Sequence, residues 1–134
     1  MISKFRGLSV ELFNEEEWKY GYLIEDEGYS FIINQVIEAN EQHITIGSWH
    51  PVNPATLGQS TGLKDKNGKE IFEGDILGTK DGLLNGVVEY RSDLGMWTNS
   101  LIRYNNFERL CNVANSREII GNIYENPEIL EENE

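Results

Sequence analysis

The residues best suited to chemistry are four carboxylates that lie close together in the middle of the sequence. Asp65, Glu70, Glu73 and Asp75 all fall within the segment GQSTGLKDKNGKEIFEGDI, residues 58–76. Carboxylate oxygens bind calcium, but an EF-hand loop beginning at Asp65 requires glycine at its sixth position and glutamate at its twelfth. Those positions hold Glu70 and Ile76, so the segment does not match this calcium loop.

Glu73 and Asp75 admit two interpretations. They are separated by one residue, so on a strand both side chains share a face and can act as a general acid and base. Alternatively, Glu73 and Gly74 form a turn in which polar side chains accept hydrogen bonds from backbone amides before the next strand begins. We favour the turn and keep a carboxylate enzyme built on Asp65, Glu73 and Asp75 as the least favoured alternative.

The single cysteine offers little further chemistry. Cys111 with His43 or His50 would make a nucleophile and a base, but neither histidine lies in a recognisable catalytic motif. The same residues lack the short paired spacing of a zinc site, and no glycine-rich phosphate loop is present. We therefore predict a buried or half-buried thiol and assign no catalytic residue, metal ligand or cofactor. One cysteine cannot form an internal disulfide, which favours a reducing compartment.

The charge balance limits the classes of partner. The chain has 134 residues, with 23 Asp and Glu against 11 Lys and Arg, and a net charge of −12. Direct nucleic-acid binding is disfavoured, because phosphate contacts need clustered basic residues. Five of the acids fall in residues 125–134, which indicates a solvated tail or, alternatively, an acidic surface that imitates DNA. No apolar run approaches the length of a membrane span, so no membrane association is expected.

Patterning predicts strands rather than helices, beginning with residues 18–25. Trp18, Tyr20, Tyr22 and Ile24 alternate with the residues between them, which places the aromatic rings on one face. Such rings can stack nucleic-acid bases, but three glutamates directly precede the segment, so we predict that this face packs in the core. Turn residues at 26–28 predict a hairpin with a strand at 29–33.

Further strands are expected at 5–10, 43–47, 70–72, 75–79, 86–91, 96–103 and 119–124, with turns at 65–68, 81–82 and 93–95. Residues 34–42 fit a helical turn as well as an irregular strand, and remain open. Asn126 and Pro127 predict a short helix over residues 127–132, capped by the Asn126 side chain. The fold class is mainly β, with an N-terminal β subdomain (1–50), a connector (51–64) and a small SH3-like barrel with the terminal helix (65–134).

Several blocks of this sequence resemble the YopX family of phage and prophage proteins. They are residues 58–76, the C-terminal EIIGNIYENPEIL (118–130), the opening KFRG (4–7) and EWKYGYLI (17–24). The resemblance spans nearly the whole chain in the expected order and implies one β-rich unit with an SH3-type barrel. It also implies a protein that acts in the cytoplasm of a bacterium carrying a phage or prophage. It implies no reaction, and no catalytic residue is carried over.

Three functions follow as expectations. The first is a non-enzymatic phage accessory protein that binds a protein partner or forms a homo-oligomer. Its contact residues are sought among Gln59, Thr61, Asp65, Glu73 and Asp75, because loops on a rigid scaffold often carry binding residues. The second is an acidic DNA mimic that inhibits a host nucleic-acid-binding protein. The third is the carboxylate enzyme described above.

Overall fold

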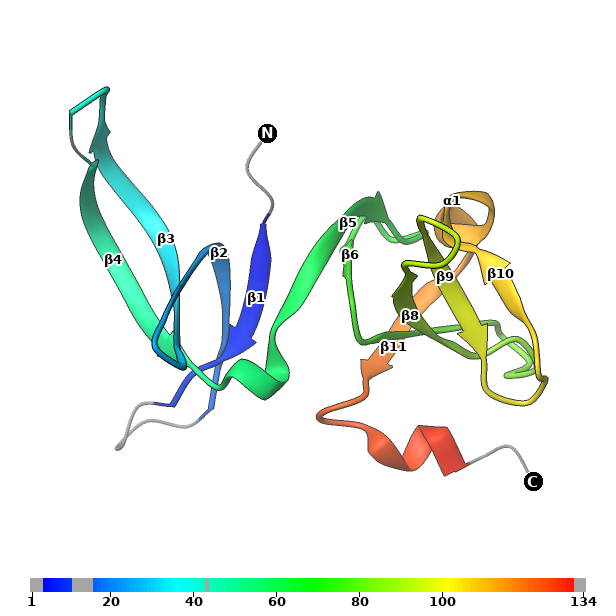
Figure 1. The fold of residues 1–134 in the computed structure, drawn as a ribbon. Helices are drawn as coiled ribbons and strands as arrows, with labels where there is room; N and C mark the ends of the chain where they lie inside the picture. Colours follow the sequence, from blue (N-terminus) through cyan, green and yellow to red (C-terminus); the bar gives the residue numbers. More distant parts are fainter. Residues whose placement is uncertain (1–3, 11–15, 43, 132–134) are drawn as a thin grey trace. The chain divides into compact units, whose positions relative to one another are not determined.

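Antiparallel β-sheet dominates the structure, as the sequence patterning predicts (Figure 1). The computed structural model describes residues 4–10, 16–42 and 44–131. The chain divides into two compact units, which we call unit 1 (Met1–Gln59) and unit 2 (Ser60–Glu134). The segment 51–64, which we expected to be a connector, contains the end of one strand, a short 3-10 helix and a further strand.

Unit 1 is built on one antiparallel sheet. Its strands are β1 (Phe5–Leu8), β2 (Trp18–Asp26), β3 (Tyr29–Ala39), β4 (Ile44–Val52) and the beginning of β5 (Gly58–Lys64). They lie in the order β4-β3-β2-β1-β5. The 3-10 helix η1, Pro54–Thr56, joins β4 to β5.

The β2–β3 hairpin forms where the turn residues predict it. Asp26 pairs with Tyr29, and Glu27 and Gly28 between them have φ angles of 46° and 87°. Positive φ at both loop residues defines a type I′ turn, whose twist suits an antiparallel hairpin. The segment left open at 34–42 is strand as far as Ala39, with register shifts against β4 between Ile33 and Glu38.

The sheet of unit 1 curls, so that the end of β4 meets the end of β1. Ser9 forms a bridge with Val52, and the amide of Asn53 donates to the Leu8 carbonyl at 2.8 Å. On the inner side of this curl, Ile32 and Val52 are buried. Gly7 has no room for a side chain there, because an added Cβ would lie 2.9 Å from the Val52 Cβ.

Unit 2 contains a second antiparallel sheet. Its strands are β7 (Asp75–Gly78), β8 (Gly86–Arg91), β9 (Met96–Leu101), β10 (Phe107–Arg109) and β11 (Glu118–Asn122), in the order β10-β9-β8-β7-β11. The later part of β5 forms a hairpin with β6, Glu70–Phe72. Within the described residues, no pairing joins β10 to β11. The mainly β class is therefore confirmed, and a closed SH3-like barrel is not.

One buried apolar cluster fills unit 2. It consists of Ile71, Leu77, Val88, Leu110 and Ala114. Two of these residues lie in elements that the sequence did not predict, the short helix α1 (Leu110–Val113) and the 3-10 helix η2 (Ala114–Ser116).

The terminal helix is the 3-10 helix η3, Pro127–Glu131. The Asn126 side chain does not cap it as expected, because its Oδ1 accepts a hydrogen bond from the Asn122 amide at 3.2 Å. Across the described ranges, no helix has the length and apolarity to cross a membrane.

Candidate interaction surface

Asp65, the first of the predicted contact residues, is used to hold the backbone together. Only 4% of the residue is exposed. Its Oδ1 accepts from the amides of Asn67 and Lys69, each at 2.9 Å, and its Oδ2 accepts from the Ile119 amide at 3.0 Å. Burial acts to raise the pKa of this carboxyl, but these three amides and the nearby Lys69 ammonium hold the pKa below its usual range.

Asp75 and Glu73 are placed differently from each other, although one residue separates them. Asp75 is 2% exposed, and its Oδ2 accepts from the Phe72 amide at 2.8 Å, across the turn that precedes β7. Glu73 is half-buried in that turn. This arrangement fits the turn that we favoured, because the buried carboxylate satisfies a backbone donor.

Gln59 and Thr61 lie in strand β5 rather than in a loop, and both are half-buried. The Thr61 hydroxyl donates to the Ile71 carbonyl at 2.8 Å and accepts from the Leu63 amide at 3.1 Å. Its polar atoms therefore hold β5 to β6. The five predicted contact residues do not form one exposed cluster.

The cysteine and the described histidine lie in different units. Cys111 is exposed in α1 of unit 2, so the expected buried or half-buried thiol is wrong. His50 lies in β4 of unit 1 with its Nε2 3.3 Å from the Ser48 hydroxyl, and His43 lies outside the described residues. Among the described side chains, no group of three His, Cys, Asp or Glu residues could hold a metal ion.

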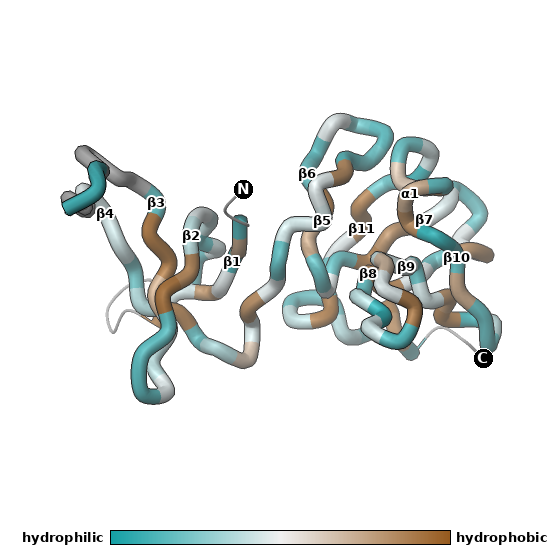
Figure 2. Tube along the Cα trace, turned by 45° about the horizontal axis from the view of Figure 1, so that its top comes forward, coloured by the Kyte–Doolittle hydropathy of each residue, from teal (hydrophilic) through white to brown (hydrophobic). Residues whose placement is uncertain are grey.

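Large apolar side chains gather on the outer face of unit 1, which we define as Tyr20, Tyr22, Ile24, Phe31 and Trp49. Tyr20, Tyr22 and Ile24 are 41–45% exposed, and Trp49 is 57% exposed. Our prediction that the aromatic face of β2 packs in the core is therefore wrong for these positions. The curl of the sheet buries Ile32 and Val52 on the opposite face, whereas these four side chains of the aromatic face stay exposed. Figure 2 shows the apolar stretch of β3 beside β2.

The outer face is hollowed. A groove of about 260 Å³ is lined by Ile24, Phe31, Ile33 and Trp49, and its walls are almost wholly apolar. The Trp49 ring meets Phe31 edge to face, with ring centroids 5.3 Å apart. Such pairs fix the orientation of both rings. A second hollow, lined by Lys4, Tyr20, Tyr22 and other residues, shares Ile33 with the groove.

Cations from β1 and from the residue before it stack on the first two aromatic rings of β2. The Arg6 guanidinium lies 4.5 Å from the Trp18 ring centroid, and the Lys4 ammonium lies 5.9 Å from the Tyr20 ring centroid. Both separations allow a cation–π interaction. Tyr22 is the next aromatic residue on the same face of β2, and among the described residues no cation stacks on it.

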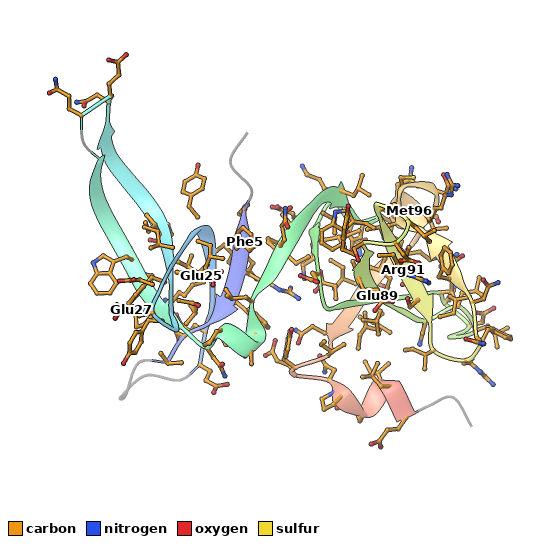
Figure 3. All side chains as sticks on the ribbon, viewed as in Figure 1. Phe5, Glu25, Glu27, Glu89, Arg91 and Met96 are labelled. Carbon is orange, nitrogen blue, oxygen red and sulfur yellow. The ribbon has the colours of Figure 1, made fainter. Side chains whose placement is uncertain are left out.

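Three carboxylates lie at the end of the β2–β3 hairpin, directly after Ile24 in the sequence. Glu25, Asp26 and Glu27 follow Ile24 directly and are all exposed at the end of the β2–β3 hairpin, where Figure 3 labels Glu25 and Glu27. No ion pair between described residues engages any of the three. The apolar groove therefore lies next to negative charge that the described chain leaves uncompensated.

Unit 2 contains a polar network that the sequence did not predict. Arg117 binds Glu108 through two hydrogen bonds of 2.6 and 2.7 Å, and the Asn99 side chain donates to Glu108 at 3.0 Å. The Arg117 hydrogen bonds hold the pKa of Glu108 below its usual range, against the effect of burial. Because Arg117 is only 7% exposed, this ion pair acts as an internal brace rather than as a binding site.

Together these features define an antiparallel β protein of two units, of which unit 1 has an aromatic groove on its outer face. A family model described as YopX protein matches residues 4–131, so the chain belongs to the YopX protein family. No curated protein shows significant similarity to the chain.

Among solved structures, the chain resembles the crystal structure of protein EF1440 from Enterococcus faecalis. The two are 31% identical, and the match covers 97% of this chain and 99% of that chain with a TM-score of 0.60.

Proposed function

We propose that this protein is a non-enzymatic protein-interaction module whose contact surface is the outer face of unit 1. The single observation that carries the proposal is the exposure of Tyr20, Tyr22, Ile24 and Trp49 around an apolar groove. Contiguous exposed apolar surface is costly to a protein that does not bind through it, and aromatic residues are enriched where partners bind.

The positions of the carboxylates support the same proposal. Asp65 and Asp75 are both buried and bound to backbone amides, which leaves them no access to a substrate. Their placement supports the non-enzymatic proposal over the carboxylate enzyme.

The biological setting is also part of the proposal. Family membership and the phage and prophage resemblance support an accessory role in a bacterium that carries a phage or prophage, with action in its cytoplasm. We further propose that unit 2, with its five-stranded sheet, serves as an SH3-like scaffold. The partner is another protein or a second copy of the chain. Sedimentation of the chain alone tests for the second copy.

The test is capture of a partner from a bacterial host with the tagged full-length chain. We compare the wild type with Trp49→Ser, which removes one wall of the groove, and with Tyr104→Ser, a matched control. Tyr104 is 50% exposed and lies in unit 2. Both variants are first shown to keep the wild-type circular dichroism spectrum.

The proposal predicts that a partner recovered with the wild type is lost with Trp49→Ser and kept with Tyr104→Ser. Equal recovery of the partner with all three proteins would show that the outer face does not bind it.

A further inference from the structure

We propose that the outer face of unit 1 binds an arginine or lysine side chain presented by an extended segment of the partner protein. The inference rests on the proposed function and names the chemistry of the partner at that surface. It is carried by three observations: the cations stacked on β2, the shape of the groove and the local charge.

The first observation is the arrangement of rings and cations along β2. Trp18 is covered by Arg6 of β1 and Tyr20 by Lys4, the residue before β1, so two aromatic residues that alternate on one face each hold a cation. The alternation continues to Tyr22, which shares a hollow with Lys4 but on whose ring no described cation stacks. A side chain from a partner would extend the same arrangement by one position.

The second observation is the fit between the groove and a long basic side chain. Arginine and lysine bury their aliphatic stems against apolar surface and keep the charged group at the edge. Ile24 and Ile33 line the groove and offer such a surface, while Trp49 stands 57% exposed at its wall. Tryptophan is the aromatic side chain that attracts a cation most strongly.

The third observation is charge, and it selects among possible occupants. Unit 1 contains nine acidic and three basic residues, a net charge of −6. Lys4 and Arg6 stack on rings, and Lys19 pairs with Glu17 at 3.0 Å. Phosphates would be repelled, as would a second copy of the same acidic unit, whereas a basic segment is attracted.

The experiment uses three capped pentapeptides as probes with the full-length chain. The first has the sequence Arg-Ile-Arg-Ile-Arg. The second replaces each arginine by citrulline, which keeps the shape and loses the charge, and the third replaces each arginine by glutamate. Binding is followed by calorimetry and by NMR shifts of the indole N–H groups.

Two variants remove an aromatic ring while keeping an apolar side chain, Tyr22→Leu and Trp49→Leu. Tyr104→Leu in unit 2 is the matched control. We expect the arginine peptide to bind the wild type. Tyr22→Leu and Trp49→Leu should each bind it about fivefold more weakly, as loss of a cation–π contact of ordinary strength implies. We also expect binding to weaken between about 50 mM and about 500 mM salt, and the control to bind like the wild type.

Several results would overturn the inference. They are equal binding of the citrulline peptide, preference for the glutamate peptide, unchanged affinity in both Tyr22→Leu and Trp49→Leu, and failure of the arginine peptide to bind. A dimer that dissociates in Trp49→Leu would identify a second copy as the occupant instead. Partner capture that depends on Trp49, together with peptides that show no preference for positive charge, would support the proposed interaction function and contradict the proposal that its ligand is a basic side chain.

Discussion

At the scale of single residues, Asp65 shows how a carboxylate typical of a functional site can be used for folding. Its two carboxylate oxygens accept hydrogen bonds from three backbone amides. Two of these amides lie in the turn that follows β5, and the third lies in β11, far away in the sequence. Its turn role was predictable, because aspartate and asparagine favour such turns. Its bond to Ile119 was not, since it joins residues 54 positions apart.

Replacing this carboxylate should be costly. Asp65→Ala leaves three amides without an acceptor, and we expect the free energy of unfolding to fall by about 3 kcal/mol. Denaturant titration measures the loss. Asp81→Ala is the control, because Asp81 is exposed and binds only within its own loop. A loss no greater than that of the control would contradict the structural role.

The same carboxylate predicts a pH dependence. The pKa of Asp65 is lower in the folded chain than its ordinary value of 3.8, so the ionised form stabilises the fold above that pH. This stability is lost as the pH falls through the depressed folded pKa. Urea titrations below about pH 4 should therefore show a steeper fall in wild type than in Asp65→Asn. An equal fall of stability with pH in the two proteins would contradict the stabilising role of the ionised Asp65 carboxylate.

The Glu108–Arg117 pair gives a second prediction at this scale. Arg117→Met removes the partner of a carboxylate that is 20% exposed, and we expect a loss of about 3 kcal/mol. The double variant Glu108→Leu/Arg117→Met should recover part of it, because no unpaired buried charge remains. Thermal and denaturant unfolding measure both. A double variant less stable than the single one would contradict this account.

At the scale of elements, Gly21 is the point where β2 changes neighbours. It pairs with Phe5 of β1, while the pairing of β2 with β3 begins at Tyr22. Gly21 has φ 153°, and a Cβ there would lie 2.1 Å from the Ile33 carbonyl oxygen. Backbone atoms cannot yield as a flexible side chain can, so the close approach requires glycine.

Gly21→Ala should therefore separate β2 from β3 and destabilise unit 1. Gly28→Ala is the matched control, since Gly28 also has positive φ but an added Cβ would meet nothing within 4 Å. The control should cost about 1 kcal/mol and Gly21→Ala clearly more. Amide hydrogen exchange across β2 and β3 measures the difference. Equal protection in the two variants would show that the contact is unimportant.

The elements also show where prediction from sequence ends. Alternation predicted β2 and placed its aromatic residues on one face, but alternation does not say which face is buried. That choice depends on the curl that brings Ser9 to Val52, a contact between distant residues. Helix α1 and strand β10 were missed because each is a single short element, of four and three residues, without a period to detect.

At the scale of the whole molecule, the net charge of −12 is compatible with both a DNA mimic and a cation-binding groove, which depend on charge in different ways. A DNA mimic depends on the total density of negative charge, whereas a cation-binding groove depends on the charge beside it. Asp26→Asn/Glu27→Gln and Glu128→Gln/Glu131→Gln each remove two charges, the first beside the groove and the second from η3.

We expect the first variant to bind the arginine peptide several-fold more weakly and the second to bind it like the wild type. Calorimetry at low salt measures both, where the loss of nearby charge is least screened. Equal weakening by the two variants would favour the charge-density explanation and the DNA mimic.

The most direct measurement of the central claim is a hydrogen–deuterium exchange footprint of the full-length chain with and without its captured partner. The account predicts that protection appears on β2, β3 and the end of β4 around Trp49, and that the exposed residues of unit 2 exchange as in the free chain. Protection confined to unit 2, with the outer face of unit 1 unchanged, would contradict it.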